Sequence, residues 1–121
     1  MVSKKNKIAR QGELLATEYL INKGYKILQN NWRYSRTGEI DIIAQKNQEI
    51  IFVEVKTRST TNCGEPFESI DENKQQQIYN LAEIYISKNQ FPETFSFRFD
   101  AIGVILKKIP EITHLENAYQ L

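Results

Sequence analysis

The chain has 121 residues, of which 40% are hydrophobic and 26% are charged, with one cysteine and a formal net charge of +1. This length fits a single domain, and this balance excludes a fully disordered, collagen-like or disulfide-stapled chain. No apolar run approaches the roughly 20 residues that span a bilayer, and no apolar stretch follows the basic N-terminus as it would in a signal peptide. We therefore expect a soluble cytoplasmic protein with a flexible basic N-terminus (residues 1–7) and one domain (residues 8–121).

Charge is unevenly distributed along the chain. Residues 1–38 carry a net charge of +6, whereas residues 39–72 carry −5. A basic segment beside an acidic one fits phosphate contact next to a carboxylate metal site. Two solvated surfaces would give the same pattern.

The first predicted elements are a helix and a strand. Ile8, Leu15 and Leu20 recur at helical spacing, and Gly24 follows where a helix would end, so we expect a helix from Ile8 to about residue 23. Residues 25–28 and 32–34 are rich in bulky side chains and predict one interrupted strand.

Residues 39–45 and 50–56 are dense in Ile and Val, and the four polar residues between them predict a hairpin loop. Residues 57–65 predict a loop. Ser69 and Glu72 have the spacing of a capping box, which predicts a helix that runs from there to about Lys88. Strands are predicted at residues 94–106 and, more briefly, at 112–115. The order is helix, three strands, helix, one or two strands, which is an α/β pattern.

The predicted hairpin places two carboxylates together. Side chains alternate between the faces of a strand, so residues 40, 42 and 44 share an apolar face and Asp41 lies on the other. A register that pairs Ile43 with Phe52 places Asp41 opposite Glu54 and residue 39 opposite residue 56.

Two opposed carboxylates repel one another unless something compensates. Mg²⁺ is one compensator, because it takes oxygen ligands from one or two carboxylates. Lys56, two residues after Glu54, would point into the same region and could hold a phosphate oxygen or orient a water molecule. The alternative is a surface cluster in which Lys56 neutralises Glu39 and Glu54 and nothing is bound.

Several motifs occur in one order along the chain. They are Arg10-Gln-Gly-Glu13, Asn31-Trp-Arg33, Gly38-Glu-Ile-Asp-Ile-Ile-Ala44, Phe52-Val-Glu-Val-Lys-Thr-Arg58, Gly64-Glu-Pro66, Lys74, Arg98-Phe-Asp100, His114 and Asn117-Ala118. Together they resemble the YraN-like family, a group of small uncharacterised bacterial proteins associated with endonucleases. The resemblance covers nearly the whole chain.

This resemblance implies a restriction-endonuclease-like fold of the PD-(D/E)xK superfamily, close to Holliday-junction resolvases, with a central mixed sheet flanked by helices. It implies that Asp41 and Glu54 hold Mg²⁺ or Mn²⁺, that Lys56 is the catalytic lysine, and that Glu13 is an additional catalytic acid. Ile40 stands where the superfamily label has proline, as is common in this branch. The implied activity is hydrolysis of DNA, with branched or junction DNA among the substrates. Symmetric cutting of two strands implies a homodimer.

Basic residues are expected to contact DNA phosphates around this site. The candidates are Arg10, Arg33, Arg36, Arg58 and Lys74, together with the lysines at positions 4, 5 and 7. Each alone fits a solvated side chain. Trp32, Tyr34, Phe97 and Phe99 could stack on bases, although at strand spacing they also fit a core.

Four side chains outside this site are expected to take no part in catalysis. His114 is the one histidine, and without a visible catalytic partner it is expected to make a structural hydrogen bond. Arg98 and Asp100 are expected to form a mutual or helix-directed ion pair, and Cys63 is expected to be incidental. Two alternatives to the nuclease stay open: a nuclease-fold module that binds nucleic acid or protein without cutting, and a protein that uses metal for stability alone.

Overall fold

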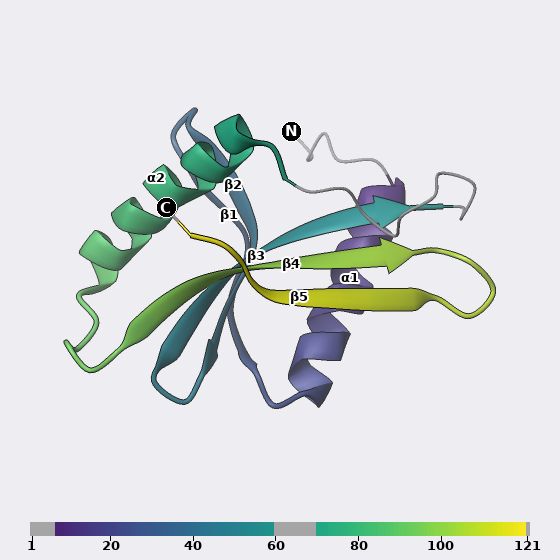
Figure 1. Cartoon of the computed structure of the whole chain (residues 1–121), viewed down its shortest axis with the longest axis horizontal. Coiled ribbons are helices and arrows are strands. Elements are labelled where there is room, and N and C mark those ends of the chain that lie inside the picture. Colours follow the sequence, from purple (N-terminus) through teal and green to yellow (C-terminus); the bar gives the residue numbers. More distant parts are fainter. Residues whose placement is uncertain (1–6, 60–69, 121) are drawn as a thin grey trace.

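The structure, a computed structural model, describes residues 7–59 and 70–120 (Figure 1). Most of the expected flexible N-terminus, the predicted loop beyond residue 59, Cys63 and Ser69 lie outside these ranges. Lys7 already belongs to the first helix, one residue before the predicted start.

Within the described residues, two helices and five strands follow one another in the predicted order. They are α1 (Lys7–Asn22), β1 (Lys26–Tyr34), β2 (Gly38–Lys46), β3 (Glu49–Arg58), α2 (Glu72–Asn89), β4 (Ser96–Ile105) and β5 (Glu111–Tyr119). The strands form one sheet in the order β1-β2-β3-β4-β5. Only β3 and β4 pair in parallel, since α2 connects them as a crossover, so the sheet is mixed. This confirms the predicted α/β fold class and matches the order of a restriction-endonuclease-like core.

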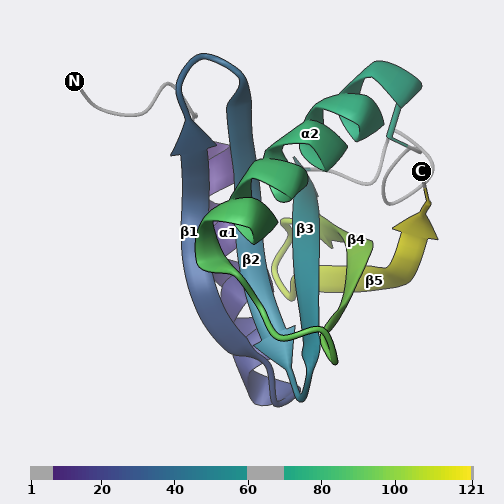
Figure 2. The same ribbon diagram turned by 90° about the vertical axis from the view of Figure 1, so that its left-hand side faces the viewer.

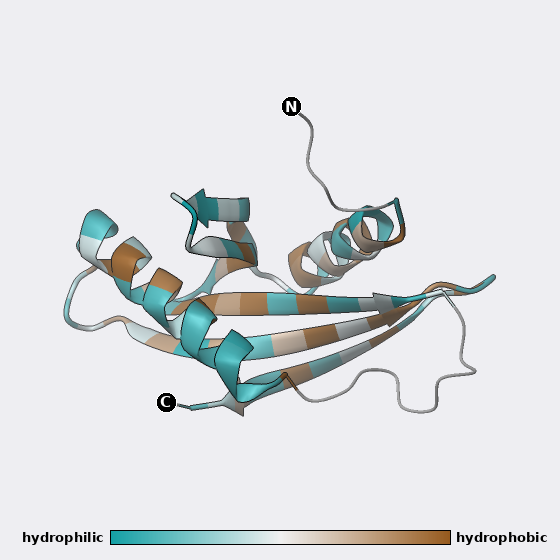
Figure 3. Cartoon of the chain, turned by 90° about the horizontal axis from the view of Figure 1, so that it is seen from above, coloured by the Kyte–Doolittle hydropathy of each residue, from teal (hydrophilic) through white to brown (hydrophobic). Residues whose placement is uncertain are grey.

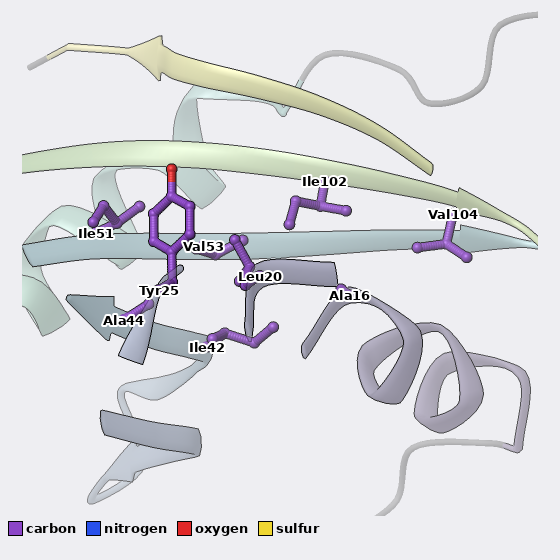
Figure 4. Close-up of a cluster of buried hydrophobic side chains, with 9 residues drawn as sticks. All are labelled: Ala16, Leu20, Tyr25, Ile42, Ala44, Ile51, Val53, Ile102 and Val104. Atoms are coloured by element: carbon purple, nitrogen blue, oxygen red, sulfur yellow. The ribbon is translucent and has the colours of Figure 1, made fainter. Parts of the chain in front are cut away.

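The helices cover opposite faces of the sheet (Figure 2). Against α1 the buried side chains form one cluster: Ala16, Leu20, Tyr25, Ile42, Ala44, Ile51, Val53, Ile102 and Val104 (Figure 4). Against α2 they form a second cluster: Ile40, Ile43, Ile50, Phe52, Ile78, Leu81, Ala82 and Tyr85. The strands are largely hydrophobic between the helices, whereas most of the visible surface of α2 is hydrophilic (Figure 3). Within the described ranges no helix has the length and apolar content needed to cross a membrane.

Some observed boundaries of the strands and turns differ from the predicted ones. The hairpin register is as predicted where the strands pair, with Ile43 opposite Phe52, but the ladder ends at Ile42 and Val53, so the predicted pairs 41–54 and 39–56 do not form. Lys46 also pairs with Glu49, so the turn is two residues long. Its first residue, Asn47, has φ 55°, a left-handed conformation that asparagine tolerates well. β5 extends well beyond the short strand expected at residues 112–115.

The start of α2 differs from the capping-box prediction. Asp71, rather than Ser69, is the N-cap, and its carboxylate accepts a hydrogen bond from the Lys74 backbone N–H at 2.8 Å. An aspartate side chain satisfies an N–H group of the first turn as well as a serine does. The first turn of α2 is therefore fixed two residues later than predicted.

The expected alternation along β2 is wrong at one point. Ile40 packs in the α2 cluster and Ile42 in the α1 cluster, although alternation predicts one shared face. The β2–β3 ladder ends at the pair Ile42 and Val53. In the neighbouring strand β1, Asn31 takes a left-handed φ of 53°. The β2–β3 ladder therefore ends beside Asp41, whereas β1 and β2 stay paired as far as Tyr34 and Gly38.

Gly12 lies where α1 touches β3. A Cβ atom on Gly12 would stand 2.7 Å from the Cβ atom of Thr57, which no rotation of the threonine side chain relieves. Alanine favours a helix over glycine, but we expect this overlap to dominate. Gly12→Ala should therefore lower the free energy of unfolding in urea by about 1–3 kcal/mol. Gln11→Ala, at the exposed neighbouring position, is the control and should leave stability nearly unchanged. A Gly12→Ala protein as stable as the wild type would refute this close approach.

Candidate functional site

A hollow in the surface lies between the beginnings of α1 and α2, where β2 and β3 stop pairing. Its lining is mostly polar and charged: Ala9, Glu13, Arg33, Gly38, Glu39, Asp41, Glu54, Val55, Lys74 and Gln77. Three of the four predicted catalytic residues, Glu13, Asp41 and Glu54, thus come together from α1, β2 and β3.

Asp41 is buried where β2 and β3 separate. Its Oδ2 atom accepts a hydrogen bond from the Val55 backbone N–H at 2.8 Å. The carboxylate thus satisfies a backbone group at a point where the ladder has stopped. This bond fixes Asp41 beside the next residue back along β3, which is Glu54.

Glu54 lies directly beside this aspartate, and its side chain is only 11% exposed. Burial raises its pKa, and the negative charge of Asp41 and a hydrogen bond between the two carboxyl groups raise it further, to about 8. The positive charges of Lys74 and, to a smaller extent, Lys56 act against this increase. Glu54 therefore remains largely protonated near neutral pH, and its carboxyl group is hydrogen-bonded to that of Asp41.

Glu13 reaches the hollow from α1 and is 8% exposed. Its Oε1 atom accepts a hydrogen bond from Asn31 Nδ2 at 2.9 Å. The same amide nitrogen is 3.4 Å from Glu39 Oε2. Asn31 thereby links the first helix to the acidic lining, and its left-handed backbone directs this contact.

The lining contains two of the predicted basic residues. Arg33 is bound to Glu39, with Nη2 and Oε1 2.6 Å apart. Lys74 Nζ lies 3.9 Å from Glu54 Oε2. Lys56 shares a face of β3 with Glu54 but does not belong to the lining.

The other predicted phosphate contacts do not belong to the lining of the hollow. Arg10 and Arg36 are exposed and Arg58 is partly buried, and none of the three lines the hollow. Of the aromatic candidates, Trp32 and Phe99 pack against the α2 cluster. Tyr34 and Phe97 are more than one third exposed.

The donor set of the hollow fits a hard divalent cation. A divalent cation between Asp41 and Glu54 would replace the proton that their mutual repulsion favours, and both side chains offer oxygen donors. Within residues 7–59 and 70–120, no three histidine, cysteine or acidic side chains are grouped to hold a metal ion. A two-carboxylate site is the arrangement that Mg²⁺ commonly uses, with water and substrate phosphate as its other ligands.

A second polar cluster serves the fold. His114 Nε2 lies 2.7 Å from Asp100 Oδ2, and His114 Nδ1 lies 3.0 Å from the hydroxyl of Tyr19. Arg98 forms the predicted ion pair with Asp100, at 2.8 Å from Nε to Oδ1. The predicted structural hydrogen bond of His114 is confirmed, and Asp100 is the partner that the sequence did not reveal.

One residue of the hollow, Gln77, and two that affect its carboxyl groups, Tyr119 and Asn31, were missed by the sequence analysis. Gln77 ties α2 to the β1–β2 turn through a 2.6 Å hydrogen bond from its Nε2 to the Thr37 carbonyl. Among residues 7–59 and 70–120 the buried Tyr119 hydroxyl has no hydrogen-bond partner, and burial together with the charge of Glu54 raises its pKa. Nothing in their sequence spacing indicates either contact, since both join distant segments. Asn31 carried a signal, because asparagine readily adopts a left-handed backbone.

Comparisons with known proteins place the chain among close relatives. A UPF0102 protein of Caldanaerobacter subterraneus subsp. tengcongensis is 41% identical over 119 residues, covering 95% of this chain and 96% of its own. One from Alkaliphilus oremlandii is 47% identical over 115 residues, covering 93% and 97%. One from Clostridium botulinum strain 657 is 44% identical over 113 residues, covering 91% of each chain.

Among solved structures, Pyrococcus furiosus SfsA in complex with Ca²⁺ is similar, with a TM-score of 0.43 and 15% sequence identity. The match covers 93% of this chain and 65% of that one, so this chain spans less than two thirds of its length.

The model of the family described as "Uncharacterised protein family UPF0102" matches residues 12–104. This match and the relatives agree with the resemblance that the sequence motifs indicated. The chain belongs to the uncharacterised family UPF0102.

Proposed function

We propose that this protein is a Mg²⁺-dependent DNA endonuclease that hydrolyses phosphodiester bonds, with branched or junction DNA among its substrates. One observation carries the proposal: the carboxyl groups of Asp41 and Glu54 lie side by side where β2 and β3 stop pairing, at the polar hollow that Glu13 and Lys74 also line. Such a pair, open to a hollow with basic side chains, suits the transfer of a phosphoryl group.

Asp41 and Glu54 are the side chains that would hold the metal. A bound Mg²⁺ or Mn²⁺ lowers the pKa of a water molecule and neutralises negative charge on the reacting phosphate. Glu13 is placed to accept a hydrogen bond from water at the α1 side of the hollow, and Lys56 is proposed to orient the attacking water. In the reaction a water oxygen bonds to phosphorus, the bond from phosphorus to the leaving sugar oxygen breaks, and that oxygen gains a proton.

Basic side chains would hold the DNA strand. Arg33 and Lys74 line the hollow, and Arg10, Arg36 and Arg58 are proposed to contact phosphates farther along. Phosphate contacts of this kind make the affinity for DNA fall steeply with salt concentration. A homodimer with two such sites is proposed for symmetric cutting.

Cleavage of a DNA panel tests the proposal. Single-stranded, duplex, flap and four-way-junction DNA are incubated with the protein and Mg²⁺ or Mn²⁺, with EDTA as the metal-free control. We expect cutting of at least one substrate, and loss of that cutting in Asp41→Asn, because the variant loses one of the two carboxylates that hold the metal. Calorimetric titration should show that metal binding is lost in the same variant.

The outcomes separate the candidate functions. Salt-sensitive DNA binding in EDTA without any cutting in metal would contradict the nuclease and favour a binding module. Metal-dependent melting without affinity for DNA would favour a metal used for stability. Equal metal affinity in wild type and Asp41→Asn would refute the site itself.

A further inference from the structure

We propose that Lys74, at the start of α2, is a catalytic residue that supplies positive charge directly to the reacting phosphate. The inference rests on the proposed endonuclease function and deepens it. The sequence predicted only a general phosphate contact for Lys74. The inference assigns the main catalytic positive charge to Lys74 of α2 instead of Lys56 of β3.

The first support is position. Lys74 lines the same hollow as Glu13, Asp41 and Glu54, and its Nζ lies 3.9 Å from Glu54 Oε2. Lys56 shares the β3 face with Glu54 but lies outside the lining, and its charge affects Glu54 less than that of Lys74 does. Of these two lysines, Lys74 is therefore better placed to reach a phosphate held at the carboxyl pair.

The second support is the way α2 fixes this lysine. The backbone N–H of Lys74 is bound by the N-cap Asp71, and Gln77, three residues on, is bound to the Thr37 carbonyl. The first turns of α2 are thus tied to the β1–β2 turn at the rim of the hollow. A side chain on such an anchored turn starts from a defined position, which is what a catalytic group requires.

The third support is that Lys74 can leave its present partner. Its side chain is 38% exposed, and 3.9 Å is the long end of an ion pair. Arg33, the other cation of the lining, is held much more closely by Glu39, at 2.6 Å. When a cation occupies the carboxyl pair, Glu54 no longer needs Lys74, and the ammonium group can turn to a phosphate oxygen. There it would stabilise the negative charge that develops during hydrolysis.

Two measurements on Lys74→Met test the inference. Removal of a positive charge close to Glu54 should tighten Mn²⁺ binding about three- to tenfold in calorimetric titration without DNA, because the charge opposes a second cation nearby. At saturating DNA, kcat should fall about 100-fold or more. A lysine that only binds DNA would instead weaken the affinity and reduce the slope of log affinity against log salt by about one, with kcat unchanged.

Lys88→Met is the matched control, since it removes a lysine from the last turn of the same helix, beside Tyr34. It should change neither metal affinity nor kcat. Lys74→Arg keeps the charge and should restore metal affinity to the wild-type value. Unchanged metal affinity in Lys74→Met, or a large loss of kcat in Lys56→Met with none in Lys74→Met, would overturn the inference.

The design separates the two proposals. If the wild type cuts and Lys74→Met turns over equally fast, the inference about Lys74 fails and the nuclease stands. If the wild type cuts no substrate, the proposed function fails, and the catalytic part of the inference fails with it.

Discussion

Asp100→Asn is expected to lower the free energy of unfolding at pH 7 by about 3 kcal/mol, because it removes the most deeply buried of the carboxylate charges that compensate Arg98, whose other close partner, Glu49, is 33% exposed. Asp100 is fully buried and the Arg98 side chain is 17% exposed. Both carboxylate oxygens of Asp100 are used, by Arg98, by His114 and by the Asn117 backbone N–H. An amide can accept only on its oxygen, so this arrangement cannot be rebuilt.

The effect has a defined pH dependence. Burial alone would raise the pKa of Asp100, but the hydrogen bonds from His114, Arg98 and the Asn117 N–H outweigh it and lower the pKa below its ordinary value of 3.8. The unfolded chain then binds more protons than the folded one as pH falls through this range, so the stabilisation is complete above about pH 4 and is lost at lower pH. Urea unfolding at pH 7 and at pH 3 should show a smaller difference between wild type and variant at the lower pH.

Glu116→Gln is the matched control, because Glu116 faces the same arginine at 3.8 Å but its side chain is 63% exposed. An exposed ion pair of this kind contributes at most about 1 kcal/mol. We therefore expect Glu116→Gln to lower the free energy of unfolding much less than Asp100→Asn does. Equal losses in the two variants would show that burial of Asp100 contributes little.

This network marks one limit of what the sequence could predict. Alternation along residues 94–106 placed Arg98 and Asp100 on one face, and their mutual ion pair followed from local spacing. The third member, His114, comes from β5, and its approach depends on the pairing of Ile102 with His114. A register between two strands is set by packing and turn geometry, so a single histidine in isolation gives no sign of its partner.

The candidate site also has features that the sequence predicts and features that it does not. The hairpin register brought Asp41 close to Glu54 correctly, since the ladder from Ile43 and Phe52 sets their approach. The end of the β2–β3 ladder beside Asp41 was not predictable from the alternation of side chains, because there the Val55 N–H binds the Asp41 carboxylate. The approach of Lys74 was equally hidden, since it depends on how α2 packs across the sheet.

Glu54→Gln is expected to stabilise the metal-free protein, although it should destroy metal binding. The substitution removes a carboxyl group whose ionised form is opposed by burial and by the charge of Asp41, and it keeps nearly the same shape. At pH 8.5 in EDTA we expect the variant to unfold with a free energy roughly 3 kcal/mol higher than that of the wild type. Stored repulsion of this kind is common where a site is built for a ligand.

The sign of the pH dependence distinguishes this effect from ordinary packing. The pKa of Glu54 is raised in the folded protein from 4.5 to about 8, so the folded state binds more protons than the unfolded state within that window. The stability of the wild type should therefore fall as pH rises from about 5 to 8, and the fall should be absent in Glu54→Gln. Thermal or urea unfolding in EDTA across this range measures it. Glu83→Gln, an exposed position on α2, is the control and should keep the wild-type slope.

Saturating Mg²⁺ should reverse the difference in stability between the wild type and Glu54→Gln. A cation that binds the folded state alone raises its stability by an amount that grows with ligand concentration, and only the wild type retains both carboxylates. With saturating Mg²⁺ at pH 8.5, the wild type should gain stability while Glu54→Gln does not. If Mg²⁺ stabilised both equally, the cation would not be held by Glu54. If the variant were the less stable protein in EDTA at high pH, the carboxyl pair would be a favourable contact in itself, and the main argument for a cation between Asp41 and Glu54 would fall.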